Sequence, residues 1–247
     1  MMWSWIPGNG SLIWQLTREN AYLGVLPALY GLALSLPLGI LAARWRWFYP
    51  PLLTVINVLY AVPSLALFIA LIPAFGLTNT NVVIALTVFS LCVILPNVVA
   101  GLRSVPDDVR QAATAMGYGP LRRLVTVELP LAMPVIIGGL RVGVVSGISL
   151  ASVGQLIGVS SLGYLFIDGL QRDFPTEIYV GLALVFVLAL ACDLVLVAIR
   201  RAVTPWMSER KGVAGPAVSA ATEERASAGD GSVPESALEQ AGNMAVR

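Results

Sequence analysis

Long apolar stretches restrict the fold of this sequence more than any other feature. A helix needs about 20 apolar residues to cross the ~30 Å hydrocarbon layer of a bilayer. Five stretches meet this length, running from about Ala21 to Ala43, Leu52 to Phe75, Val82 to Leu102, Pro134 to Val153 and Ile178 to Ile199. Only 12% of the residues are charged, against about a quarter in soluble domains. The sequence predicts an all-α, polytopic membrane protein with about five transmembrane helices.

A further apolar segment, Gln155–Leu170, is shorter and rich in glycine and serine. This composition is more typical of a re-entrant or interfacial segment than of a full span. A sixth span remains the alternative at this point.

The basic residues are distributed unevenly between the segments that join the spans. If the N-terminus lies outside, the cytoplasmic segments hold Arg44, Arg46, Arg103, Arg110, Arg122, Arg123, Arg200, Arg201, Arg210 and Lys211. The outer segments then hold only Arg18 and Arg172. Cytoplasmic loops carry the excess of arginine and lysine. The distribution therefore predicts an external N-terminus and a cytoplasmic C-terminus.

Three parts of the chain differ in composition. Residues 1–20 are expected to form an extracytoplasmic N-terminal segment, and residues 21–206 the membrane domain. Residues 207–247 are rich in alanine, glycine, serine and glutamate. Such a composition cannot bury enough apolar surface to fold, which predicts a disordered cytoplasmic tail.

Several residue types that chemistry requires are missing. The chain has no histidine, and its two cysteines lie in apolar stretches, so we expect neither catalytic residues nor a metal site. The only lysine, Lys211, precedes Gly212, whereas a nucleotide-binding P-loop needs G-x-x-x-x-G-K-[ST]. Any ATP-driven work must therefore be powered by another subunit. No basic stripe of the kind that nucleic-acid binding requires is present.

The segment between the third and fourth predicted spans is polar and helix-forming, and residues 111–130 have the sequence QAATAMGYGPLRRLVTVELP. Ser104 is suited to capping a helix here, and Pro106 to its first turn. Asp107 and Asp108 would place negative charge at the positive end of the helix dipole. Four apolar residues then recur at the spacing of one helix face: Val109, Ala112, Ala113 and Met116. The pattern predicts a short amphipathic helix.

Gly117 and the pair Gly119-Pro120 predict the end of this helix and a sharp turn. A second short helix is expected, with Leu121, Leu124 and Val125 on one side and Arg122 and Arg123 on the other. Leu129-Pro130 is expected to close the passage before the chain re-enters the membrane. The pattern by itself is also compatible with an ordinary amphipathic loop resting on lipid headgroups.

The spacing of this segment resembles a signature of permease subunits of ATP-binding-cassette importers. In that family the cytoplasmic loop carries EAA, three residues, G, nine residues, I, one residue and LP. This chain has Gln111, Ala112, Ala113, Gly117, Val127, Leu129 and Pro130 at matching intervals. Gln111 replaces the glutamate, which removes a charge, and Val127 conservatively replaces the isoleucine.

Two further regions, Thr54–Gly76 and Gly154–Phe174, are similar to the osmoprotectant branch of these permeases, which imports glycine betaine, choline and carnitine. The resemblance covers roughly Ala21 to Arg201. It implies a transport subunit without enzymatic activity in a bacterial cell membrane, surrounded by lipid and without nucleic-acid partners. It also implies a second permease subunit (identical or similar), two ATP-binding subunits and an extracytoplasmic solute-binding protein. ATP and magnesium would be bound by the partner ATPase.

The resemblance implies that the loop formed by residues 103–130 couples the permease to the ATPase. Its two short helices would dock in a groove of the ATPase and move when the ATPase pair closes. The ATPase-coupling residues would be Gln111, Ala112, Ala113, Met116, Gly117, Val127, Leu129 and Pro130. The apolar stripe would supply the contact, Gly117 would allow close backbone approach, and Leu129-Pro130 would tie the loop to the fourth span.

The fourth predicted span carries small residues at four-residue intervals: Gly139, Gly143, Gly147 and Ala151. A face of small residues lets helix backbones approach closely in lipid. The face could serve packing within one subunit or a contact between two permease subunits that lines the pathway.

Arg141 and Asp193 are costly inside a membrane and therefore draw attention. They could form a structural pair, Arg141 could reach the cytoplasmic interface, or the two could relay protons or substrate. The relay would suit a proton-coupled secondary transporter, which is the least favoured function. A permease of the same class for methionine or an oxyanion is the nearer alternative. The aromatic residues show no cage for a quaternary ammonium ion, so substrate-binding residues are not identified.

Overall fold

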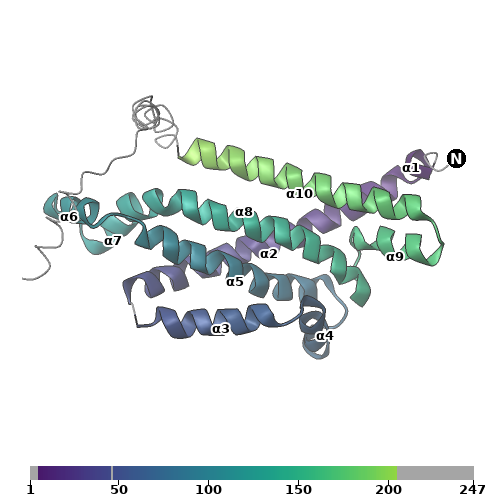
Figure 1. Ribbon diagram of the computed structural model, residues 1–247, viewed down its shortest axis with the longest axis horizontal. Coiled ribbons are helices and arrows are strands. Elements are labelled where there is room, and N and C mark those ends of the chain that lie inside the picture. Colours follow the sequence, from purple (N-terminus) through teal and green to yellow (C-terminus); the bar gives the residue numbers. More distant parts are fainter. Residues whose placement is uncertain (1–4, 46, 205–247) are drawn as a thin grey trace, which may run out of the picture. The chain divides into compact units, whose positions relative to one another are not determined.

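The computed structural model describes residues 5–45 and 47–204, and in this part of the chain every regular element is a helix (Figure 1). The α-helices are α1 (Trp5–Gly8), α2 (Gly10–Arg44), α3 (Tyr49–Ala61), α4 (Ser64–Phe75), α5 (Asn79–Arg103), α6 (Asp107–Ala115), α7 (Pro120–Arg123), α8 (Leu129–Val153), α9 (Gly163–Gln171) and α10 (Pro175–Val203). A π-helical turn, η1 (Leu124–Glu128), precedes α8, and a 3-10 turn, η2 (Gly154–Ile157), follows it. The predicted all-α fold class is confirmed. The predictions made for Arg46 and for the tail from residue 207 onward lie outside the described residues.

Helices α2, α5 and α8 form the core of the described part, and α2 crosses the other two (Figure 1). One buried cluster takes Ala28 from α2, Ile94 and Val98 from α5, and Ile136 and Ile148 from α8. Glycines on α2 permit this packing: a Cβ atom added to Gly39 would lie 2.5 Å from Cγ1 of Val98. Close backbone approach of this kind is how helices associate where lipid removes the hydrophobic drive.

Four helical runs are long and apolar enough to cross a membrane: Gly10–Arg44, Asn79–Arg103, Pro120–Ile157 and Pro175–Val203. The pair α3 and α4 makes a fifth if it is taken as one span. Helix α2 has 35 residues, a length of about 52 Å at 1.5 Å per residue. Residues 10–20, which the sequence analysis assigns to an N-terminal segment, are therefore continuous with the first span.

The second predicted span, Leu52–Phe75, is not one helix, because α3 and α4 meet at a bend of 93°. Val62 adopts the extended conformation with ψ of 126°, as a residue before proline prefers, and Pro63 follows it. Asn81 of α5 fixes the second arm: its Nδ2 donates to the carbonyl oxygens of Phe68 (3.2 Å) and Gly76 (2.9 Å). The predicted span from Leu52 to Phe75 is therefore bent at Pro63, which average hydropathy does not reveal.

The segment at 155–170 folds into η2, a turn and α9. Helix α9 has nine residues and is therefore about 14 Å long, which is too short for a span. Asn20 of α2 links this segment to the core. Its Oδ1 accepts hydrogen bonds from the Leu162 backbone N–H (3.3 Å) and the Ser152 hydroxyl (3.2 Å).

Candidate functional site

The loop between α5 and α8 contains α6, a turn, α7 and η1. Asp107 and Asp108 lie in the first turn of α6, as predicted. Ser104 does not cap α6: its hydroxyl donates to the Gly101 carbonyl (2.8 Å) at the end of α5, and Pro106 takes the N-cap position. The expectation that Ser104 starts the helix was wrong, because the hydroxyl is closer to the open carbonyls of the helix that precedes it.

Gly117 ends α6 in a left-handed conformation with φ of +83°. The Gly117 N–H donates to the Thr114 carbonyl (2.9 Å), and the Tyr118 N–H donates to the Ala113 carbonyl (3.1 Å). This pair of bonds is the Schellman motif, whose left-handed position favours glycine. A Cβ atom at Gly117 would meet nothing within 4 Å. Within this chain, glycine is therefore required by the backbone conformation and not by close approach of a neighbour.

Helix α7, η1, α8 and η2 form one continuous helical run from Pro120 to Ile157. Leu129-Pro130 therefore does not close the passage as expected. In η1 the Leu129 N–H reaches back to the Leu124 carbonyl, and this wider turn relieves the clash that a proline ring causes in a regular helix. The second helix of the loop is consequently the first turn of the fourth span.

Glu128, which the sequence analysis did not single out, joins α6 to this long helix. Its Oε1 accepts a hydrogen bond from Nε of Arg123 (2.7 Å), and its Oε2 lies 3.8 Å from Nε of Arg110. Arg110 also donates to the Leu102 carbonyl (2.7 Å), and Arg123 to the Thr114 hydroxyl (3.0 Å). We call this set of contacts the Glu128 clamp. The signal in the sequence was a lone carboxylate between apolar residues and nearby arginines.

The four residues of the predicted apolar stripe of α6 differ in their exposure to solvent. Ala113 is buried and Val109 half-buried, whereas Ala112 and Met116 are exposed. Gln111 is exposed on the same helix, and Val127, Leu129 and Pro130 are half-buried. Three large apolar side chains are mostly exposed along this loop: Met116 (69%), Leu121 (74%) and Val125 (60%). The loop thus presents apolar groups on a frame that polar contacts hold together.

The small residues of α8 pack inside the chain. Gly139, Gly143 and Gly147 are all buried. A Cβ atom at Gly139 would lie 2.5 Å from Cβ of Asn97 on α5, and one at Gly147 would lie 2.7 Å from the Gly24 carbonyl oxygen on α2. In the structure this face contacts α5 and α2 of the same chain, which is the first of the two alternatives.

Arg141 of α8 and Asp193 of α10 form a bidentate ion pair. Nε and Nη2 of the guanidinium donate to the two carboxylate oxygens at 2.7 Å and 2.6 Å. The two side chains are 30% and 24% exposed. The donor edge of the guanidinium faces the carboxylate directly. Of the three roles considered for these residues, this geometry fits a structural ion pair.

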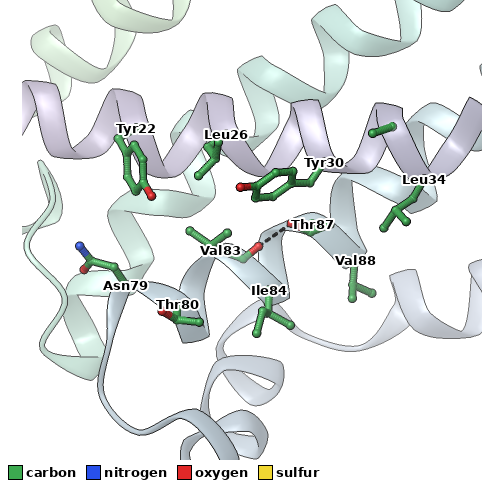
Figure 2. A pocket seen from close by; sticks show the side chains of 11 residues that line it. Tyr22, Leu26, Tyr30, Leu34, Asn79, Thr80, Val83, Ile84, Thr87 and Val88 are labelled. Atoms are coloured by element: carbon green, nitrogen blue, oxygen red, sulfur yellow. Dashed lines mark hydrogen bonds between the residues drawn. The ribbon is translucent and has the colours of Figure 1, made fainter.

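A groove of about 660 Å³ lies between α2 and α5. Figure 2 shows Tyr22 and Tyr30 facing it from α2, opposite Thr80, Val83 and Ile84 of α5. Both tyrosines are about half exposed, and the lining has no charged side chain. The groove therefore offers aromatic faces and hydroxyls but no partner for an ion pair. The eight-residue interval between the tyrosines was the sequence signal for it.

Comparison with known proteins places the chain in a family. Residues 35–209 match the family described as binding-protein-dependent transport system inner membrane component. The chain belongs to this family. The predicted relationship to importer permeases is thereby confirmed, and with it a multi-pass membrane transport component that works with an ATPase and a solute-binding protein.

The relatives and solved structures agree with this assignment. The chain is 31% identical over 202 residues to the osmoprotectant import permease protein OsmW of Salmonella typhimurium, covering 80% of this chain and 94% of the relative. It is also 31% identical to the choline transport system permease protein OpuBB of Bacillus subtilis, covering 80% and 91%. A structure of the MetNI methionine ABC transporter in an inward-facing conformation superposes with a TM-score of 0.70 over 78% of this chain and 96% of that chain. At 22% identity that likeness concerns the fold alone.

Proposed function

We propose that the chain forms the translocation pathway of an ATP-driven importer for a quaternary ammonium solute such as glycine betaine, choline or carnitine. The relatives named for osmoprotectant and choline import support this substrate class. A relative from Bacillus subtilis named for glycine betaine, carnitine and choline transport, 31% identical over 205 residues, supports it further. The chain catalyses no covalent chemistry in this proposal, and ATP with magnesium is bound by the partner ATPase.

The proposal rests on the structure of the loop at residues 103–130, which combines exposed apolar side chains with a continuous connection to α8. Met116, Leu121 and Val125 expose apolar surface that a soluble partner can cover. Gln111 and Ala112 flank this surface on α6, and the Schellman turn at Gly117 fixes its tip. A force applied to the loop reaches the pathway directly, because α7 continues into α8. Ala113, Val127, Leu129 and Pro130 serve this linkage from the inner side.

The orientation follows from the arginines at the loop's end of the molecule. Arg44 ends α2, Arg103 ends α5, and Nη2 of Arg103 donates to the Ala42 carbonyl (3.1 Å). Arg200 and Arg201 lie in the last turn of α10. Under the positive-inside rule these ends face the cytoplasm of a bacterial cell and the N-terminus faces outward.

The working unit is a pair of permease subunits with two ATPases and an extracytoplasmic binding protein. ATP binding closes the ATPases, which draws the two loops together and opens the helices outward to receive solute. Hydrolysis returns the pathway to the inward-facing state. The bend between α3 and α4 and the long exposed side of α10 leave these elements able to shift against the α2–α5–α8 core.

Uptake measurements test the proposal. The chain is expressed with the ATPase and the binding protein of its source organism, in a strain lacking its own compatible-solute importers. Radiolabelled glycine betaine, choline and carnitine are offered in parallel with methionine and sulfate. We expect ATP-dependent uptake of at least one quaternary ammonium solute. Uptake of methionine or sulfate alone would reassign the substrate. Uptake that survives ATP depletion but stops when the proton gradient collapses would replace the importer by a secondary transporter.

A further inference from the structure

A cavity of about 260 Å³ lies where the ends of α2 and α5 meet the coupling loop. Three arginines and one carboxylate line it, namely Arg44, Arg110, Arg123 and Glu128, beside an apolar wall that includes Ile40 and Leu124. We call it the arginine cavity. We propose that the arginine cavity binds the phosphate group of an anionic phospholipid.

The charges of the arginine cavity are not balanced within the described residues. The single carboxylate of Glu128 serves two guanidinium groups, with Nε of Arg123 at 2.7 Å and Nε of Arg110 at 3.8 Å. Nε of Arg110 is shielded from solvent and has no hydrogen-bond acceptor in the structure. Arg44, in the last turn of α2, forms no side-chain hydrogen bond or ion pair with any described residue. Asp107, which does not line the cavity, pairs with Nη1 of Arg110 (3.1 Å). Three guanidinium groups are thus matched by two carboxylates, and Arg44 is the group left without one.

An anion with several oxygens fits this arrangement. Guanidinium groups bind phosphate through paired N–H donors and are the preferred side chains for this purpose. The cavity volume of about 260 Å³ far exceeds the ~30 Å³ share of one water molecule, so a hydrated phosphate group has room. A carboxylic acid would satisfy fewer of the donors.

The position of the arginine cavity favours a lipid as the source of the phosphate. Trp45 and Trp47 follow Arg44 and are 49% and 75% exposed, and exposed tryptophans mark the headgroup level of a bilayer. Ile40 lies one turn before Arg44 on the membrane side, where an acyl chain would run. Basic pockets at the cytoplasmic ends of transmembrane helices recognise anionic headgroups. This inference rests on the cytoplasmic orientation given under the proposed function.

A bound lipid would connect the membrane to the coupling loop. Arg44 belongs to α2, Arg110 to α6 and Arg123 to α7, so one phosphate group would hold three elements together. The lipid would add to the contacts that already hold α6, namely the Glu128 clamp and the buried side chain of Ala113. The anionic lipid content of the membrane would then set how firmly the loop is held.

Native mass spectrometry of the full chain, purified with the subunits that accompany it, tests the proposal. The sample is titrated with phosphatidylglycerol, and phosphatidylcholine serves as the zwitterionic control. A hydrogen bond from Arg44 to a phosphate oxygen would contribute about 1 kcal/mol, which is about a fivefold change in affinity. We expect Arg44→Gln to weaken phosphatidylglycerol retention about fivefold, and Arg44→Lys to restore most of it. Arg201→Gln, which removes the same charge at the end of α10 outside the cavity, should change nothing.

Equal retention by wild type and Arg44→Gln would overturn the proposal, and so would equal retention of the two lipids. Inorganic phosphate separates the two sources of a phosphate group. Displacement of phosphatidylglycerol by millimolar phosphate would show a site for free anions instead of lipid. If Arg44→Gln instead loses ATPase subunits at unchanged lipid retention, the cavity belongs to a protein contact. None of these readouts depends on uptake, so failure of the transport proposal would be recognised separately.

Discussion

The loop at residues 103–130 and helix α10 both pack on the outside of the α2–α5–α8 core, but they are held in different ways. The loop is fixed by directional polar contacts: the Schellman turn at Gly117, the Glu128 clamp, and the bonds from Arg110 and Arg123 to neighbouring groups. Helix α10 buries only Thr176, Glu177 and Gly181. Otherwise it is held by half-buried apolar side chains that pack against α8, α9 and α2, and by the pair of Arg141 with Asp193.

The difference shows what each region is suited to contact. Polar bonds define one geometry, so the apolar groups that the loop exposes are presented at fixed positions, as recognition of a protein groove requires. Apolar contact is non-directional, so α10 can slide or tilt while its exposed side chains remain in lipid or against another permease. A loop fixed by polar bonds and a helix attached mainly by apolar contact would suit the transport mechanism proposed above.

The largest expected effect comes from breaking the loop tip with Gly117→Glu. A side chain in the left-handed conformation costs about 1–2 kcal/mol, and this one also projects into the surface proposed for the ATPase. The protein should insert into the membrane normally while ATP-driven uptake of its solute is abolished, as measured with labelled solute and a membrane-fraction immunoblot.

Gly119→Ala is the matched control for this prediction. Gly119 has φ of −65°, which any residue adopts, and a Cβ atom there would meet nothing within 4 Å. Uptake should remain near wild type. Full uptake by a well-expressed Gly117→Glu variant would remove the coupling role from this turn.

A smaller effect is expected from Glu128→Gln, which leaves Arg123 without a carboxylate partner and Arg110 with Asp107 alone. Hydrogen bonds to charged groups contribute about 1.5–3 kcal/mol, so α6 should come loose from the long helix. We expect ATP hydrolysis to continue while the amount of solute imported per ATP falls several-fold. Measuring both rates in the same vesicles checks this. An unchanged ratio would show that the clamp does not transmit the motion.

Asp193→Asn should weaken the attachment of α10, and its effect should be smaller than that of Glu128→Gln on the loop. The asparagine oxygen can still accept a hydrogen bond from Arg141 while the ion pair is lost, so the free energy of unfolding should fall by about 1 kcal/mol. The thermal unfolding temperature should drop, and exchanging both residues (Arg141→Asp with Asp193→Arg) should recover it. A changed pH dependence of uptake, with stability unaltered, would instead support a proton relay.

The smallest effect is expected from Pro130→Ala. The wider turn of η1 already accommodates the proline ring, so removing it should change the unfolding free energy by no more than about 1 kcal/mol. Uptake should stay within about twofold of wild type, because the continuous helix and not the proline transmits the motion. A large loss of uptake at normal stability would show that the proline itself shapes the coupling.

The spans of this protein can be predicted from local sequence, and the errors of that prediction also arise from using local sequence alone. Hydropathy averaged over a window finds α2, α5, α8 and α10, because each must satisfy its backbone inside lipid. The same averaging passes over Pro63, although a residue before proline avoids the helical conformation. At Pro130 the error is the reverse. A proline predicts a helix break, but the five-residue π-helical turn η1 before it lets the helix continue.

The coupling loop was partly predictable for a similar reason. The interval from Gln111 to Pro130 identifies the segment, and Gly117 marks its turn, because both are properties of neighbouring residues. Glu128 was missed because its meaning depends on Arg110, which lies eighteen positions away and reaches it only after the chain turns back at Gly117. The tyrosines of the groove were missed because their partners are on α5.

The sequence by itself determined that the chain is helical, apolar enough to cross a membrane several times and interrupted by an amphipathic loop, since solvent and local backbone chemistry dictate these features. Only the tertiary structure decided which helices form the core and that Gly139 and Gly147 pack inside one chain. It also decided that Arg141 meets Asp193 and that arginines from three elements surround one cavity. These contacts join residues far apart in the chain, and their energies depend on distances that no local pattern specifies.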